Sequence, residues 1–483
     1  MTSESDATRR NRAPVDHAIR RLALPFVTLR RFPWLAAALD PIETAALEAP
    51  FSRPDAVGAW GAKTSARYAR ALARARGLEF VTLEDGPYRS VGLGKANAAS
   101  LSLTLDLGGV FFDARTISDF EAMLLGALPA GLEARGADLR AFVVAARLSK
   151  YNHAPETPIR LDAPRGARRI LLVDQVAGDR SLAGAGAGPE TFALMQAQAL
   201  AAARDEGAAV FVKRHPDVVA GYGRGMLNAP APPFRPAPDA GPHALLDEID
   251  EVWTASSQFG FDALLRGVKV VAFAVPFYAG WGATELRVEA AAAHARAALA
   301  RRAASGPLSV DMLAGAMIGA FPRYFDPVSG RRVAAEAALE RLAFWRDQAF
   351  ERRGPIVAVG FARHKRSLLR AYCGAAKSEI AFAWREPADV VAFARAGRAR
   401  EVVVWSDRLS LAGESAARAA VLAVTRVEDG FIRSRGLGRK RTPPASLCFD
   451  PRALHFEAGR ASALEKLLQT HVFTDAERAR GAA

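Results

Sequence analysis

The chain has 483 residues, half of them hydrophobic, and its 65 Lys and Arg against 51 Asp and Glu give a formal net charge of +14. This length suits about three domains of ~150 residues, and the apolar content is enough for large buried cores. Two cysteines without metal-ligand spacing, short apolar runs broken by Arg and no signal-peptide pattern argue against a disulfide scaffold, a transmembrane helix and a secreted protein. We therefore expect a reduced, cytosolic protein.

The positive charge has two interpretations. Arg-rich helices such as 65–77 place basic residues on solvated surfaces, and we assign most of the charge to them. The interleaved basic and apolar residues of 18–39 also suit an interfacial helix on an anionic membrane, or an N-terminal element packed on the core. We treat residues 1–50 as an N-terminal arm. Aromatic and basic residues do not alternate in a stacking pattern, so no nucleic-acid partner is expected.

From residue 56 onward, helices and strands alternate in the manner of an α/β protein. A polar joint with Pro and Gly near residue 160 predicts two half-domains, 51–160 and 161–350, the second ending in a closing helix over 331–350. The expected strands are 56–62, 79–83, 169–173, 208–212, 251–255 and 269–273, and the expected helices are 65–77, 117–147, 190–205 and 256–267.

One segment occurs twice: EDGPYRSVGLGKANAASLSLTLD at 84–106 aligns without a gap with EDGFIRSRGLGRKRTPPASLCFD at 428–450, at a constant offset of 344. Each copy follows a β-branched apolar run, which is typical of a buried parallel strand. Each therefore places a carboxylate pair, Glu84–Asp85 or Glu428–Asp429, at the carboxyl end of a strand, where ligands bind in open α/β sheets. We expect 351–483 to be a partial second module that repeats only the first half-domain.

Polar residues also follow three strands of the second half-domain. One such strand end means little, because Asp and Ser are ordinary helix caps. Several together, opposite the carboxylate pair of the first half-domain, predict a cleft. The three groups are Asp174 with Gln175, then Lys213 with His215, Pro216 and Asp217, and finally Ser256 with Ser257 and Gln258.

The residue types in these groups suit an anionic ligand. Pro216 keeps His215 extended, so Lys213 and His215 face one side, where they can neutralise or protonate a leaving phosphate. The helix that begins at Ser256–Ser257 offers unpaired backbone N–H groups to a phosphate, unless the serines only cap it. Asp174 can attack an anomeric carbon, bind a sugar hydroxyl or cap a turn.

The motifs EDGxxRSxGLG, VDQ with a glycine-rich loop, VKRHPD and SSQFGFDALLRG with PFYAGWG closely resemble the capsule polysaccharide β-Kdo transferases of the KpsC type. The resemblance spans roughly 55–290 as one full module and 354–483 as the first half of a second. It implies an α/β, GT-B-like pair of Rossmann-like half-domains that face each other across a cleft, followed by a partial repeat of the first. The first half-domain would then be the acceptor side and the second the CMP-sugar side.

The resemblance also implies an activity and a location. The enzyme would move β-Kdo from CMP-β-Kdo to a lipid-linked oligo-Kdo acceptor with retention of configuration. It would be cytoplasmic and peripheral on the inner face of the inner membrane, beside capsule assembly and export proteins. A donor with one phosphate needs no divalent ion, and no Asp-x-Asp signature occurs at a matching strand end. We therefore expect neither a metal nor another cofactor.

Retention by double displacement needs a carboxylate nucleophile. By resemblance, Asp174 is that nucleophile and Glu84 is its acid/base partner. Adjacent residues of an extended segment point to opposite faces, so one of Glu84 and Asp85 faces the cleft, for which we favour Glu84, and the other holds the loop. We count Asp85 and His215 with Asp174 and Glu84 as catalytic candidates. Arg89 with Ser90 suits a sugar carboxylate. The residues assigned to the donor and its phosphate are His215, Lys213, Gln175, Pro216, Asp217, Ser256, Ser257 and Gln258.

Two alternatives remain open. One is a non-catalytic scaffold that binds polyanions or glycolipids in the capsule machinery, and the other is a sialyltransferase-like transferase of another CMP-sugar. The intact clusters of the first module favour an enzyme, and only donor preference separates the two enzymes. The printed sequence has no second VDQ, HPD or SSQ segment, so Glu428, Asp429 and Arg433 form a partial site that we expect to be inactive alone.

Overall fold

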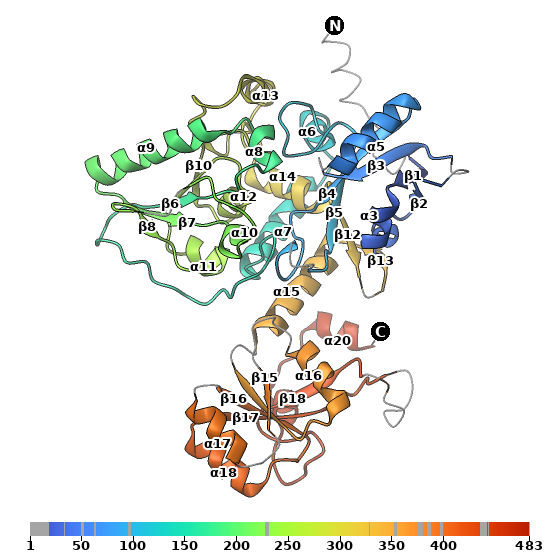
Figure 1. The fold of residues 1–483 in the computed structure, drawn as a ribbon, viewed down its shortest axis with the longest axis vertical. Helices are drawn as coiled ribbons and strands as arrows, with labels where there is room; N and C mark the ends of the chain where they lie inside the picture. The colour runs from blue at the N-terminus through green and yellow to red at the C-terminus, as the bar shows by residue number, and fades with distance from the viewer. Residues whose placement is uncertain are drawn as a thin grey trace. The chain divides into compact units, whose positions relative to one another are not determined.

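The computed structural model falls into two compact units, residues 1–346 (unit 1) and 347–483 (unit 2), and each is described by itself (Figure 1). No helix among the described residues is long and apolar enough to cross a membrane. The structure describes residues 19–482 apart from 33, 50–52, 62–63, 95–97, 228–230, 328, 352–354, 374–379, 384–387, 397–398, 435–441 and 443.

The first half of unit 1 is a seven-stranded sheet of order β13-β12-β5-β4-β3-β1-β2. Strands β2, β1, β3 and β4 are parallel. Strand β5 runs antiparallel to β4, β12 antiparallel to β5, and β13 antiparallel to β12. The strands are β1 (Arg21–Leu24), β2 (Glu43–Ala46), β3 (Ala56–Trp60), β4 (Glu79–Asp85), β5 (Ser102–Asp106), β12 (Arg323–Asp326) and β13 (Arg331–Val333). Its early helices are α3 (Phe26–Arg31), α4 (Leu35–Leu39) and α5 (Thr64–Ala75).

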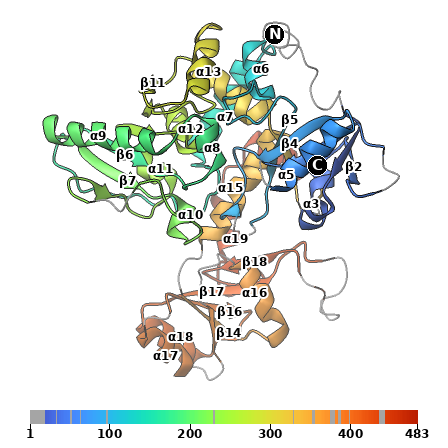
Figure 2. The same ribbon diagram turned by 45° about the horizontal axis from the view of Figure 1, so that its top comes forward.

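The second half of unit 1 is a fully parallel sheet of order β11-β10-β9-β6-β7-β8. Helix α9 packs Phe192, Met195 and Ala199 against it (Figure 2), and the continuous apolar runs of its central strands fit burial on both faces. The strands are β6 (Arg169–Val173), β7 (Ala209–Lys213), β8 (Arg235–Pro236), β9 (Glu251–Thr254), β10 (Lys269–Ala272) and β11 (Glu285–Leu286). The helices are α8 (Arg180–Gly184), α9 (Pro189–Asp205), α10 (Pro216–Val219), α11 (Pro242–Leu246), α12 (Gln258–Leu265) and α13 (Ala293–Ala303).

One hydrophobic core joins the two halves. It contains Tyr88 and Phe120 from the first half and Phe261 and Phe277 from the second, with the Phe120 and Phe277 rings edge-to-face at 5.7 Å. The connecting helices are α6 (Asp119–Leu125), α7 (Leu132–Ala145), α14 (Val310–Ala314), a π-helical turn (Gly315–Ala320) and α15 (Ala335–Glu351). This shared core fixes two Rossmann-like halves face to face and confirms the predicted GT-B-like fold.

The predicted domain boundaries differ from the structure in two places. The sequence predicts an N-terminal arm over 1–50, but residues 21–46 place β1 and β2 inside the first sheet, and Leu22 and Leu24 are fully buried. The stretch 18–39 is a strand and two short helices where described, not one interfacial helix. Strands β12 and β13 belong to the first sheet although the predicted second half-domain contains them. Both differences have one cause: strand pairing over long sequence distances leaves no local signal.

Unit 2 holds a five-stranded sheet of order β15-β14-β16-β17-β18. The order and directions equal those of β2-β1-β3-β4-β5, and Glu428 pairs with Cys448 as Glu84 pairs with Thr104. The strands are β14 (Ile356–Val359), β15 (Ile380–Phe382), β16 (Glu401–Trp405), β17 (Ala423–Asp429) and β18 (Leu447–Asp450). The helices are a 3-10 turn (Arg363–Lys365), α16 (Arg366–Tyr372), α17 (Ala388–Arg395), α18 (Leu411–Ala419), α19 (Ala463–Thr470) and α20 (Asp475–Ala482).

Candidate active site

Two cavities lie between the halves of unit 1. The small cavity, of about 180 Å³, is lined mainly by strand ends of the second half, and the large cavity, of about 740 Å³, is lined by residues of both halves. Lys150, Tyr151 and Asp179 line both, so the two form one cleft. Every predicted site residue of unit 1 except Ser90 lines one of these cavities.

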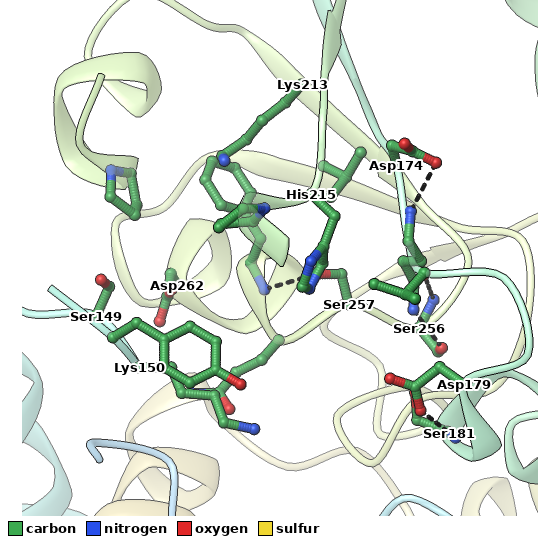
Figure 3. A pocket seen from close by; sticks show the side chains of 18 of the residues that line it. Ser149, Lys150, Asp174, Asp179, Ser181, Lys213, His215, Ser256, Ser257 and Asp262 are labelled. Atoms are coloured by element: carbon green, nitrogen blue, oxygen red, sulfur yellow. Dashed lines mark hydrogen bonds between the residues drawn. The ribbon is translucent and has the colours of Figure 1, made fainter. Parts of the chain in front are cut away.

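Lys213 and His215 lie on one wall of the small cavity, where β7 gives way to α10 (Figure 3). His215 caps α10, and its Nδ1 accepts a hydrogen bond of 3.1 Å from the Asp217 backbone N–H. The neutral imidazole therefore carries its proton on Nε2, which remains available to donate. Burial lowers the pKa of His215 and lowers that of Lys213 to about 8. A bound anion would favour the charged form of both groups.

Ser256 and Ser257 line the same cavity, at the start of α12. Gln175 holds Ser256 by two hydrogen bonds. The Ser256 backbone N–H donates to Gln175 Oε1 at 2.9 Å, and Gln175 Nε2 donates to Ser256 Oγ at 3.1 Å. Ser257 Oγ accepts from the Phe259 N–H at 3.2 Å and caps the helix. The first turn of α12 thus points its positive dipole end at the cavity, which suits a phosphate.

Gln258 connects the two halves of the cleft. Its Nε2 donates to the carbonyl oxygen of Pro87 at 2.6 Å, so the start of α12 is tied to the loop after β4. This bond links the candidate phosphate site to the loop that follows Glu84 and Asp85. We infer that Gln258 positions the two walls.

Asp174 follows β6 and is completely buried. Its Oδ1 accepts from the backbone N–H groups of Gln175 and Leu227, each at 2.9 Å. Its Oδ2 has no hydrogen-bond partner in the described part of the chain and lies 3.8 Å from Arg214 Nε. Burial raises the pKa of Asp174, against the backbone hydrogen bonds and Arg214, which lower it. Gly225 covers Oδ2 so closely that a Cβ there would lie 2.0 Å from it.

Glu84 is the last residue but one of β4 and lines the large cavity. Burial, and then the charge of Asp85, raise its pKa to about 7, while Lys150 works against both. Its Oε1 accepts from the Asp85 N–H at 3.1 Å. A carboxyl group with this pKa can take and return a proton at neutral pH.

Asp85 and Arg89 form a buried ion pair of 2.8 Å. Arg89 Nη1 also donates to Ser90 Oγ and to the Ala98 carbonyl oxygen, both at 3.0 Å. These contacts hold the loop after β4 in place, as expected for Asp85. Arg89 still lines the large cavity, but Ser90 is fully buried outside both cavities, so its position does not support contact with a sugar carboxylate.

Lys150 and Asp262 are among the cleft residues that the sequence patterns do not mark. Lys150 follows α7; burial lowers its pKa, but Tyr151, Asp85 and Glu84 outweigh burial and raise it. Asp262 lies on α12, is 4% exposed and has no described hydrogen-bond partner for Oδ1. Burial holds its pKa well above the usual range. Neither residue ends a strand, which was the signal used to select candidates.

In unit 2, Asp429 pairs with Arg433 at 2.6 Å, next to Glu428. Burial lowers the pKa of Lys365, and the nearby charges of Asp429 and Glu428 offset this only in part. Among the described residues of both units, no group of three or more His, Cys, Asp or Glu is arranged to hold a metal ion.

Residues 55–318 match a family described as "Capsule polysaccharide biosynthesis protein". The capsule polysaccharide modification protein LipA of Neisseria meningitidis is 32% identical over 434 residues, which cover 87% of this chain and 59% of LipA. The lipopolysaccharide-processing protein LpsZ of Rhizobium meliloti is 32% identical over 297 residues, 60% of this chain and 64% of LpsZ. The chain thus spans less than two thirds of the length of these relatives.

A solved structure shares the fold. It is Thermosulfurimonas dismutans KpsC, described as a beta Kdo 2,4 transferase, with a TM-score of 0.59 and 30% sequence identity. The superposition covers 68% of this chain and 98% of that one.

Proposed function

We propose, since the chain belongs to the family of capsule polysaccharide biosynthesis proteins, that unit 1 is a retaining glycosyltransferase. It moves β-Kdo from CMP-β-Kdo to a Kdo-terminated glycolipid. The observation that carries this proposal is the cleft, which has an anion site on one wall and a carboxyl group of pKa about 7 on the other. The 30% identity to a structure described as a beta Kdo transferase supports the choice of sugar.

The phosphate of the donor binds in the small cavity. His215 donates from Nε2, Lys213 adds a positive charge, and the first turn of α12 at Ser256 adds backbone N–H groups. Each favours the extra negative charge that the phosphate gains when CMP leaves. Because these groups balance one phosphate, the reaction proceeds without a divalent ion in this proposal.

Asp174 is the proposed nucleophile. Its Oδ2 attacks the anomeric carbon, the bond to the phosphate oxygen breaks, and CMP leaves with the electron pair. An acceptor hydroxyl then attacks the same carbon, Glu84 takes the hydroxyl proton, and the Asp174 ester bond breaks. Because Asp174 is covered, the segment around Gly225 must withdraw before attack.

A lipid-linked acceptor requires access to a membrane surface. We place the enzyme in the cytoplasm, at the inner face of the inner membrane, with capsule assembly and export proteins as neighbours. In α3, Phe26 and Val27 are 57% and 64% exposed beside Arg30 and Arg31. Exposed apolar side chains next to arginines suit an anionic lipid surface.

The test is a transfer assay with CMP-Kdo and a synthetic acceptor that ends in β-Kdo, with products followed by mass. We expect Asp174→Asn to lower the rate by on the order of 10³-fold or more. Asp162→Asn changes an exposed carboxyl outside both cavities and is the matched control.

The outcomes separate the competing functions. Transfer from CMP-sialic acid but not from CMP-Kdo would leave a CMP-sugar transferase with a different donor. Binding of the glycolipid without transfer from either donor would support a scaffold. Full activity of Asp174→Asn would remove Asp174 as the nucleophile.

A further inference from the structure

An aromatic cluster forms one wall of the large cavity, and the mechanism above does not use it. Phe32, Trp34 and Trp60 line the cavity, and the first two come from the N-terminal segment before β2. Phe32 stacks on Trp60 at 5.0 Å between ring centroids, and Trp34 meets Trp60 edge-to-face at 6.1 Å. Trp34 also stacks on Phe325 at 4.6 Å, which anchors the cluster in the sheet core.

The aromatic cluster lies next to Glu84 in the structure. Trp60 ends β3, and the next residue, Gly61, approaches the carboxyl group so closely that a Cβ there would lie 3.0 Å from Glu84 Oε2. Since Glu84 and the three aromatic residues line the same cavity, a ligand can touch both. The large cavity, at about 740 Å³, falls within the range of typical ligand sites, about 300–1,000 Å³.

Two exposed arginines also line the large cavity. Arg31 comes from the first half and lies 5.6 Å from the Phe32 ring centroid, and Arg180 begins α8 in the second half. Neither has a carboxylate partner in the part of the chain that the structure describes, whereas Arg89 is paired with Asp85. The cavity also has carboxyl groups, on Glu84, Asp85, Asp179 and Asp217, of which Asp179 accepts from the Ser181 N–H at 2.9 Å.

We propose that Phe32, Trp34 and Trp60 form a platform for the acceptor chain, and that Arg31 and Arg180 bind its carboxylates. The platform holds acidic sugar rings behind the one whose hydroxyl attacks. Aromatic faces pack on the C–H faces of sugar rings, and arginine forms paired hydrogen bonds with carboxylates. This inference rests on the proposed function, because it takes Glu84 to act on an acceptor.

Unit 2 provides an internal contrast. Trp405 is the last residue of β16, as Trp60 is the last residue of β3. The two strands hold the same place in the shared sheet order. The Nζ of Lys365 lies 3.2 Å from the centroid of the Trp405 ring, and Phe361 meets that ring edge-to-face at 5.5 Å. A charged side chain therefore covers one face of the Trp405 ring, whereas an aromatic ring, that of Phe32, covers one face of Trp60 in unit 1.

The experiment compares Arg31→Ala and Phe32→Ala with matched controls elsewhere in the first half, Arg76→Ala and Tyr68→Ala. Arg76 and Tyr68 are exposed and line neither cavity. With a soluble acceptor of two or three β-Kdo units, we expect the first pair to raise the acceptor KM about tenfold, the loss of one good contact. The KM for CMP-Kdo and the KM for an acceptor of one Kdo unit should not change.

Equal acceptor KM values for Arg31→Ala and Arg76→Ala would overturn the platform. If no variant transfers Kdo, calorimetry with tri-β-Kdo and with neutral cellotriose takes the place of the assay. Acidic-sugar binding that Arg31→Ala and Phe32→Ala weaken and the controls do not would keep the platform while the proposed activity fails. Binding unchanged in all four variants, or equal binding of cellotriose, would reject it. Circular dichroism checks that each variant is folded.

Discussion

The two copies of the repeated segment build the same local network in unit 1 and in unit 2. The ion pair of Asp85 with Arg89 at 2.8 Å recurs as Asp429 with Arg433 at 2.6 Å. Arg89 donates to the carbonyl oxygen nine residues later at 3.0 Å, and Arg433 does the same at 3.1 Å. Matching sequence has therefore given matching backbone, side-chain pairing and register.

The surroundings of the two networks differ. Arg89 is 7% exposed and Arg433 is 23% exposed. Tyr88 is buried at 1% exposure in the core shared with the second half-domain, whereas Ile432, its counterpart, is 85% exposed. The comparison shows that the segment makes its own geometry, while the burial that raises the pKa of Glu84 comes from another part of the chain.

The sharpest break in the comparison is catalytic. Glu84→Gln should lower the rate of Kdo transfer by about 10²–10⁴-fold, the range for loss of a general acid/base, and Glu428→Gln should leave it unchanged. Since the pKa of Glu84 is about 7, its basic form grows as pH rises through 7, and wild-type activity should rise there too. The residual activity of Glu84→Gln should lack this rise. An equal loss in Glu428→Gln would show that unit 2 contributes to catalysis.

The next difference is in stability. Tyr88→Ala should lower the free energy of unfolding by about 3–5 kcal/mol because it leaves a cavity in a shared core, and Ile432→Ala should change it by less than ~0.5 kcal/mol. Urea denaturation measures both. Tyr88→Phe is the matched control: the buried hydroxyl has no described hydrogen-bond partner, so its removal should cost little. A large effect of Ile432→Ala would mean that this side chain is covered in solution.

The smallest expected difference tests what the copies share. A Cβ on Gly86 would lie 2.3 Å from Ser102 Oγ, and a Cβ on Gly430 would lie 2.2 Å from Ser446 Oγ. Both Gly→Ala changes should destabilise the local fold, by about 1–3 kcal/mol for overpacking, and less at Gly430 because Ser446 is only partly buried. The exchange rates of the backbone amide hydrogens in the two loops measure the effect in each unit separately. No effect at either glycine would contradict the shared network.

The sequence alone determined local structure and the residues that carry chemistry. Apolar runs located the central strands of the second sheet within one residue, and all the site residues predicted in unit 1 except Ser90 line the cleft. These features are set by neighbours along the chain, through burial patterns, helix caps and the restriction that Pro216 places on His215.

The tertiary structure alone decided what surrounds those residues. It drew β1 and β12 into one sheet, brought Lys150 from the end of α7 to Glu84, and put Phe32 and Trp34 beside Trp60. It also turned Ser90 away from the cleft and covered Asp174. Burial and long-range contacts depend on the whole chain, because a side chain's exposure and pKa are set by what packs on it in space.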